Sequence, residues 1–184
     1  MVVTKVGASC VPFLIAAGLV AAASMTGCGS CPVGREIVIP VADQTDPAVA
    51  LDFHLPGGQI ISASAASSPR VVVVPGGGTV TLIASATDDQ GAKDIQLWIG
   101  TKTCTTDPAT GTATCAGPGL QGAPTASNPD TRSAGQNGCT ARLVSHNLVV
   151  TRTPTSSVSY EVEARGLNFG GRQAHTQVIR LEAQ

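Results

Sequence analysis

The residues best equipped for chemistry in this chain are its cysteines, of which the sequence has six. Cys10 and Cys28 flank the apolar amino-terminal run, and the other four lie beyond it: Cys31, Cys104, Cys115 and Cys139. An even set of cysteines in an exported chain predicts disulfides, and four cysteines allow three pairings. We favour Cys104 with Cys115, because the Thr-rich residues on either side of the intervening turn could form a hairpin, which leaves Cys31 with Cys139. Zinc is the competing chemistry, but no C-x-x-C pair repeats and none stands near a pair of histidines.

Acidic side chains suggest a second chemistry, the coordination of calcium. Asp88 and Asp89 lie in a turn, and Asp43 or Asp46 could join them at one end of a β-sandwich. Calcium is bound by oxygen ligands such as carboxylates, backbone carbonyls and water. A plain acidic turn explains the same residues more simply, so the sequence favours no metal site and no cofactor.

Catalytic motifs are not found in the sequence. The three histidines, His54, His146 and His175, fall in three separate predicted strands. There is no G-x-S-x-G or H-E-x-x-H motif, and the glycine run at 76–78 lacks the lysine of a phosphate-binding loop. The net charge of −1 provides no basic face for nucleic acid. We therefore expect a protein that is not an enzyme and does not bind nucleic acid.

Trp98 is the most informative single side chain. It is out of phase with Ile95, Leu97 and Ile99, which predicts that it points to the opposite face of its strand. Either the segment that follows covers it, which we favour, or it is exposed as a stacking platform for a sugar or a protein. Trp98 is thus the candidate binding residue.

The elements that would position these residues are β-strands. Between Gly76 and Gly100, apolar side chains occupy every second position on both sides of an acidic, glycine-containing turn at 88–91. This period of two is typical of half-buried strands. The same alternation returns in shorter segments before and after this region, and aromatic residues make up only 3% of the chain. Small and β-branched side chains must therefore form the core, as suits a sheet.

Residues 43–184 are predicted to form an all-β domain of about seven strands, an antiparallel β-sandwich. An up-and-down barrel is the alternative. Periodicity is lost over residues 101–138, which are rich in Thr, Pro, Gly and Asn. A loop of this length is unusual inside a compact domain, so we expect an insertion closed by disulfides.

The amino terminus has the features of an export signal. One lysine precedes an apolar run from Val11 to Ala23 that is too short to cross a bilayer as a helix. The residues Met25-Thr26-Gly27-Cys28 that follow resemble the lipobox of bacterial lipoproteins, which implies a signal peptide at 1–27 and lipid on Cys28. The resemblance implies anchoring in the cell envelope, with Gly29 typical of sorting to the outer membrane, and residues 28–42 would be a lipidated tether. The alternative is secretion without lipid after cleavage behind Ala23.

The domain itself resembles the bacterial immunoglobulin-like domains of secreted and surface proteins. The resemblance rests on D-x-T-x-P-x-V-x-L from Asp43, T-V-T-L-x-A-x-A-x-D-D-x-G from Thr79, and Y-x-V-x-A from Tyr160. It implies an immunoglobulin-like sandwich in which the Tyr160 hydroxyl bonds to the backbone upstream, as in a tyrosine corner. Such modules serve adhesion, spacing and carbohydrate binding, so the fold leaves the activity open.

Together these patterns predict an envelope-anchored lipoprotein with a non-catalytic binding or structural role. Its partners would be the membrane, through the lipid on Cys28, and an envelope protein or a glycan. A carbohydrate-binding module that uses Trp98 is the alternative function.

Overall fold

A computed structural model describes residues 31–107, 109–110, 113–151 and 156–183 of the protein. These residues form strands and turns, with no helix among them. The predictions for residues 1–30, including the signal peptide and the lipid on Cys28, therefore lie outside the described part. No helix able to cross a membrane is found in the part that is described.

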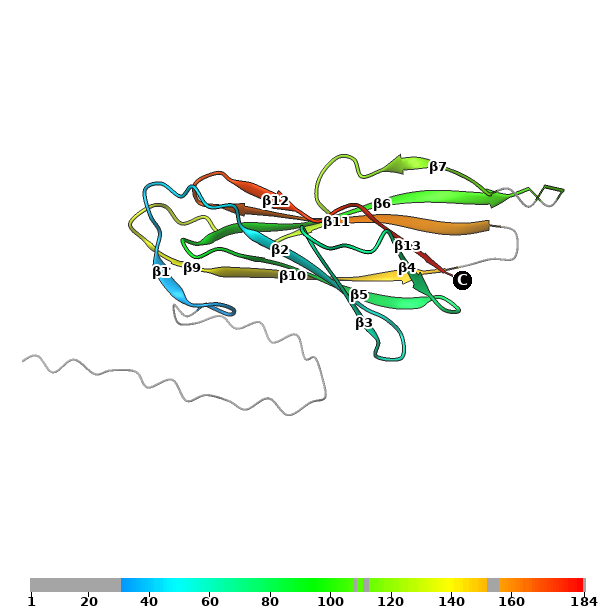
Figure 1. Ribbon diagram of the computed structural model, residues 1–184, viewed down its shortest axis with the longest axis horizontal. Coiled ribbons are helices and arrows are strands. Elements are labelled where there is room, and N and C mark those ends of the chain that lie inside the picture. Colours follow the sequence, from blue (N-terminus) through cyan, green and yellow to red (C-terminus); the bar gives the residue numbers. More distant parts are fainter. Residues whose placement is uncertain (1–30, 108, 111–112, 152–155, 184) are drawn as a thin grey trace, which may run out of the picture.

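Two sheets packed face to face confirm the predicted all-β sandwich (Figure 1). The smaller sheet has the order β10-β5-β2-β3 and is antiparallel throughout. Its strands are β2 (Ala48–His54), β3 (Ile60–Ser64), β5 (Gly78–Thr87) and β10 (Ala141–Val150).

The larger sheet has the order β4-β13-β11-β6-β7, with β12 beside β11 and β8 beside β6. All its pairs are antiparallel except β4 with β13, which is parallel. Its strands are β4 (Val71–Val74), β6 (Ala92–Thr106), β7 (Ala113–Gly119), β8 (Ala126–Ser127), β11 (Ser156–Asn168), β12 (Gln173–His175) and β13 (Ile179–Ala183). A separate pair, β1 (Glu36–Val38) with β9 (Asn137–Cys139), lies at one end.

The core follows from the alternation in the sequence. The strands that face the other sheet place every second side chain between the sheets, and the fully buried hydrophobic side chains are small or aliphatic apart from Phe53. At Gly166 of β11 the two layers lie too close for a side chain, because a Cβ atom there would lie 2.7 Å from Val49 and 3.0 Å from Ala86. The low aromatic content thus matches a thin core.

Two segments differ from their prediction. Residues 101–138, expected as a loop, contain the end of β6 and strands β7 and β8, because β6 continues beyond the smaller sheet and pairs with β7 as a projecting hairpin (Figure 1). In the segment assigned to the tether, residues 36–38 form β1, as their sequence allowed for an edge strand, but the segment is not free: β1 pairs with β9, and Ile39 is buried. The sandwich therefore has more strands than the seven predicted.

Two disulfides join the cysteines in the favoured pairing. Cys104 and Cys115 lie opposite each other in the β6–β7 hairpin, with their Cα atoms 4.0 Å apart. Cys31 and Cys139 connect the amino-terminal segment to β9 across a sequence separation of 108 residues. The Tyr160 hydroxyl donates a hydrogen bond to the Val149 carbonyl oxygen at 3.0 Å, as the tyrosine-corner prediction requires.

Candidate functional site

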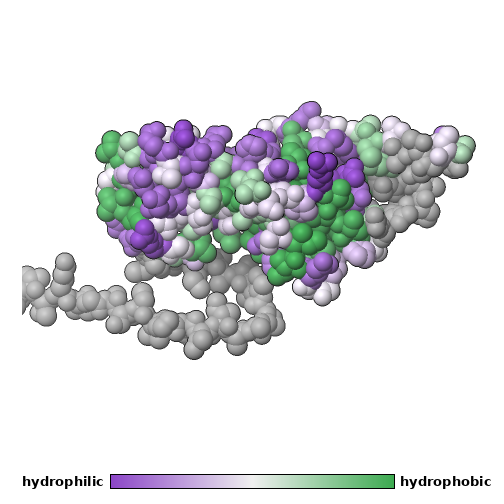
Figure 2. All heavy atoms as spheres, viewed as in Figure 1, coloured by the Kyte–Doolittle hydropathy of each residue, from purple (hydrophilic) through white to green (hydrophobic). Residues whose placement is uncertain are grey.

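The outer surface of the larger sheet carries a row of polar side chains around Trp98. Ile95 and Leu97 of β6 point into the core, so Gln96 and Trp98 point outward. In the register of the sheet, Gln96 is opposite Arg165 of β11, and Arg165 is opposite His175 of β12. Figure 2 shows hydrophilic spheres gathered where β11 and β12 lie. We call this surface the Trp98 face.

The ring of Trp98 is half-buried, and Arg165 is the residue that lies over it. The Cζ atom of Arg165 is 4.2 Å from the ring centroid, a cation–π contact. The indole Nε1 donates to Oε1 of Gln96 at 3.1 Å. We expected the 101–138 insertion to cover this ring, but the contact on it comes from β11. Strand β8, which belongs to the insertion, instead pairs with β6 at Gln96 and Leu97.

A buried carboxylate holds Arg165 in place. Glu163 is only 5% exposed and accepts hydrogen bonds from Nε and Nη2 of Arg165, at 3.0 and 2.7 Å. Nδ1 of His175 lies 3.1 Å from Oε1 of Glu163 and 3.0 Å from the carbonyl oxygen of Thr176. Because the buried carboxylate needs these partners, Arg165 is fixed over Trp98 rather than free in solvent.

Two cavities flank Arg165 on this face. One, of about 350 Å³, is lined by Glu163, Arg165, Gln173, Ala174 and His175. The other, of about 230 Å³, is lined by Gln96, Trp98, Arg165, Gly166, Leu167 and Gln173. Arg165 and Gln173 line both, so one extended partner could contact both cavities together.

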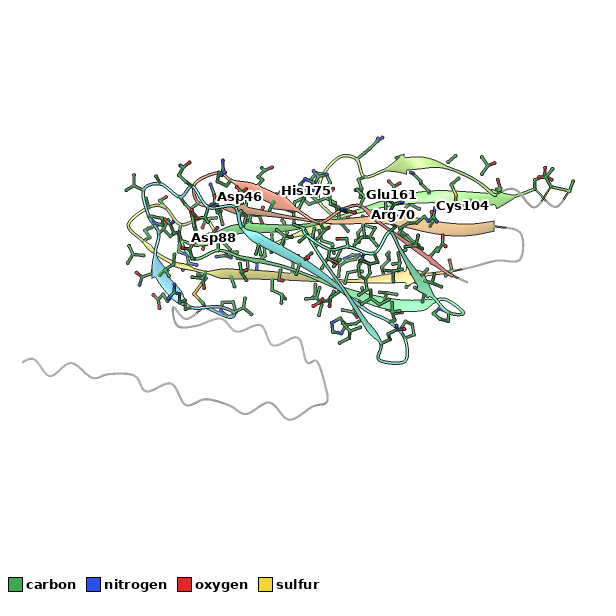
Figure 3. The ribbon with its side chains drawn as sticks, viewed as in Figure 1. Asp46, Arg70, Asp88, Cys104, Glu161 and His175 are labelled. Carbon is green, nitrogen blue, oxygen red and sulfur yellow. A yellow bond between two sulfur atoms is a disulfide. The ribbon has the colours of Figure 1, made fainter. Side chains whose placement is uncertain are left out.

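The four aspartates considered for calcium are all near one end of the sandwich, and they divide into two kinds. Asp43 and Asp88 are buried, whereas Asp46 and Asp89 are exposed. Figure 3 shows Asp46 and Asp88 at the end opposite to Cys104. Asp46 pairs with Arg172, with Oδ1 2.8 Å from Nε. Among the described residues no group of three His, Cys, Asp or Glu side chains is placed to hold a metal ion.

Burial raises the pKa of Asp88, and the neighbouring carboxylate of Asp43 raises it further. The backbone N–H of Gln90, which donates to Asp88, and the nearby amide of Asn168 act in the opposite direction. The buried pair is thus a place where negative charge is poorly compensated, a point that the sequence did not reveal.

The three histidines remain on separate strands, β2, β10 and β12. His175 is the one that the fold brings to the Trp98 face. Sequence analysis missed Glu163, Arg165 and Gln173. The only available signal was their alternation along β11 and β12, because their proximity to Trp98 depends on a strand pairing between residues far apart in the chain.

No protein-family model matches this chain, and no curated protein matches it.

Proposed function

We propose that this protein is an envelope-anchored lipoprotein that binds a partner without catalysis, through the Trp98 face. The observation that carries the proposal is the arrangement of Trp98, Arg165 and Glu163 between two cavities. Trp and Arg are the residues most enriched among those that dominate binding energies at interfaces. An arginine already fixed by a buried carboxylate loses little conformational freedom when a partner binds.

The anchor in this proposal is lipid on Cys28, as the lipobox resemblance implies. Cys31, three positions further on, is bonded to Cys139 in β9. Three extended residues reach about 11 Å at most, so the lipidated residue could not stand far from the β1–β9 end of the domain. The anchor would then hold the domain close to the membrane, where the Trp98 face can meet an envelope protein.

An envelope protein fits the Trp98 face better than a glycan does. A sugar-binding aromatic residue offers the flat face of its ring, and here the guanidinium of Arg165 lies over the ring of Trp98. A glycan would have to displace Arg165 from the carboxylate of Glu163, leaving a buried charge without its cation. A partner protein can instead contact Trp98 and Arg165 as they stand.

The anchoring part is tested by expressing the full chain with its own signal and labelling it with radioactive palmitate. We expect label in the membrane fraction for the native chain and none for Cys28→Ser. An unacylated mature chain that begins at Ser24 would contradict the anchor and favour plain secretion.

The binding part is tested by chemical cross-linking in intact envelopes, followed by mass spectrometry of the captured partner. Trp98→Ala and Arg165→Ala should reduce capture of the same partner by about tenfold or more, the size expected for a dominant interface residue. Arg70→Ala is the matched control, since Arg70 is exposed just before β4 and is not part of the Trp98 face. Equal capture by all four proteins would refute a role for the Trp98 face.

A further inference from the structure

Two buried aspartates lie together at the end of the sandwich that carries β1 and β9. Asp43 is 1% exposed and Asp88 is 7% exposed. Oδ1 of Asp43 accepts a hydrogen bond from the backbone N–H of Thr45 at 3.0 Å, and Oδ1 of Asp88 accepts one from Gln90 at 2.8 Å. The second oxygen of each carboxylate, Oδ2, is buried and has no hydrogen-bond partner. We call these two residues the facing aspartates.

The fold fixes the facing aspartates against each other. Asp88 directly follows β5 and Asp43 precedes β2, and these two strands are antiparallel neighbours that meet at this end. The backbone of Gly170 packs on Asp43 so closely that a Cβ atom would lie 1.9 Å from its carbonyl oxygen. Asn168, which is fully buried, donates from Nδ2 to the Thr45 carbonyl oxygen at 2.6 Å. The carboxylates therefore cannot move apart without disrupting this packing.

Two ionised carboxylates in this position are costly unless a positive charge compensates them. None of the ion pairs found in the described residues involves Asp43 or Asp88. The carboxylate of Asp43 adds to burial in raising the pKa of Asp88. A bound cation or a shared proton can remove this cost, and two unpartnered oxygens suit a cation.

We propose that Oδ2 of Asp43 and Oδ2 of Asp88 bind one calcium ion at this end of the sandwich. Calcium accepts irregular sets of oxygen ligands, including backbone carbonyls and water, whereas magnesium demands a near-ideal octahedron. With no third acidic or histidine side chain placed to join them among the described residues, the other ligands are backbone or water oxygens. So few carboxylates predict weak binding, with a dissociation constant of about 0.1–1 mM, as in extracellular modules.

An open cavity of about 440 Å³ reaches Asp88, one of the facing aspartates, and gives the ion a route to it from solvent. Asp46, Asp88 and Asp89 line it, together with Arg35 and Thr140 among others. The exposed carboxylate of Asp89 attracts a cation toward the buried pair, whereas that of Asp46 is already paired with Arg172. Asp89 also provides a matched control, because it is adjacent to Asp88 in sequence but exposed.

The test is a thermal melt of the full chain in detergent, with calcium added to a chelator-treated sample at neutral pH. Calcium at 10 mM should raise the melting temperature by about 3–5 °C, and magnesium by less. Asp43→Asn and Asp88→Asn should abolish this shift, since each keeps the shape and the Oδ1 acceptor of its turn but removes the charge. Asp89→Asn should keep the shift.

Two results would overturn the site: no calcium-dependent shift in the native chain, or the same shift in Asp88→Asn. If calcium leaves the melting temperature of the native chain unchanged and Asp88→Asn melts at a higher temperature than the native chain, the two carboxylates share a proton instead. If neither variant folds, amide NMR of the native chain decides. Calcium must then shift the resonances of Thr45 and Gln90, whose N–H groups bond to the two carboxylates, and unchanged resonances would refute the proposal.

Discussion

The sandwich buries carboxylates in two different ways, and Asp130 is the counterpart of the facing aspartates. Asp130 is 6% exposed, as deeply buried as Asp88. Arg132 binds it with both ends of its guanidinium, from Nε to Oδ1 at 2.7 Å and from Nη2 to Oδ2 at 2.6 Å. Arg142 of β10 binds its Oδ2 as well. The facing aspartates have no such arginine.

Folding therefore shifts the pKa of Asp130 and the pKa of Asp88 in opposite directions, although both carboxylates are buried. Burial of Asp130 opposes its ionisation, but the hydrogen bonds and charges of Arg132 and Arg142 outweigh burial and lower its pKa to about 2. Burial and the carboxylate of Asp43 raise the pKa of Asp88. The comparison teaches that the choice of neighbours, more than the depth of burial, decides whether a buried acid stabilises the fold or needs an external partner.

Asp130 also connects parts of the chain that strand pairing leaves apart. Arg142, which binds it, donates from Nε to the carbonyl oxygen of Ala92 at 3.2 Å and from Nη1 to Oδ1 of Asn128 at 3.2 Å. The segment after β8 is thereby attached to β10 in one sheet and β6 in the other. The facing aspartates close the same end of the sandwich but rely on packing and turns.

The largest expected effect is the loss of Asp130. Asp130→Asn should lower the free energy of unfolding by about 3 kcal/mol, because it leaves the mostly buried guanidinium of Arg142 without its counter-charge. Urea unfolding followed by circular dichroism measures this, with the exposed Asp89→Asn as the control. An equal stability of the two variants would mean that Asp130 and Arg142 do not act as a buried pair.

The pH dependence of stability should separate the two sites in calcium-free buffer. The pKa of Asp130 is lowered by folding, so its contribution is present above about pH 4 and is lost as the pH falls through about 2. The pKa of Asp88 is raised by folding, so its ionisation disfavours the fold increasingly as the pH rises above 3.8 through the raised value. As the pH rises, the native chain should therefore gain stability relative to Asp130→Asn. Over the same range it should lose stability relative to Asp88→Asn. Urea midpoints at a series of pH values measure both, and parallel slopes would contradict the comparison.

Much of the fold could be predicted because apolar alternation reports directly on the core. Val80 to Ala86 and Ile95 to Leu97 have the expected faces, and the outward direction of Trp98 followed from its phase. The β6–β7 hairpin was missed because it projects beyond the smaller sheet (Figure 1). A strand with no second sheet to cover has no apolar face, so its Thr-rich sequence resembles a loop.

The candidate sites were less predictable because they depend on pairing across the chain. Arg165 reaches Trp98 through the register of β6 with β11, and Asp130 meets Arg142 through a turn after β8. Asp43 and Asp88 were recognised as possible neighbours from their positions at strand ends. Their burial, and the lack of a partner for each Oδ2, depend on packing by residues such as Gly170 and Asn168.

The smallest expected effect concerns the exposed ion pair at the same end, between Arg172 and Asp46. Their side chains are 49% and 61% exposed, so water solvates both charges whether or not they pair. Arg172→Ala should change the free energy of unfolding by less than about 0.5 kcal/mol, since the backbone N–H of Arg172 still donates to Asn168. Urea unfolding of Arg172→Ala and Asp130→Asn under the same conditions compares the two losses of stability directly. A loss approaching that of Asp130→Asn would show that an exposed arginine also supports this end, and that burial of the ion pair is not what sets the difference.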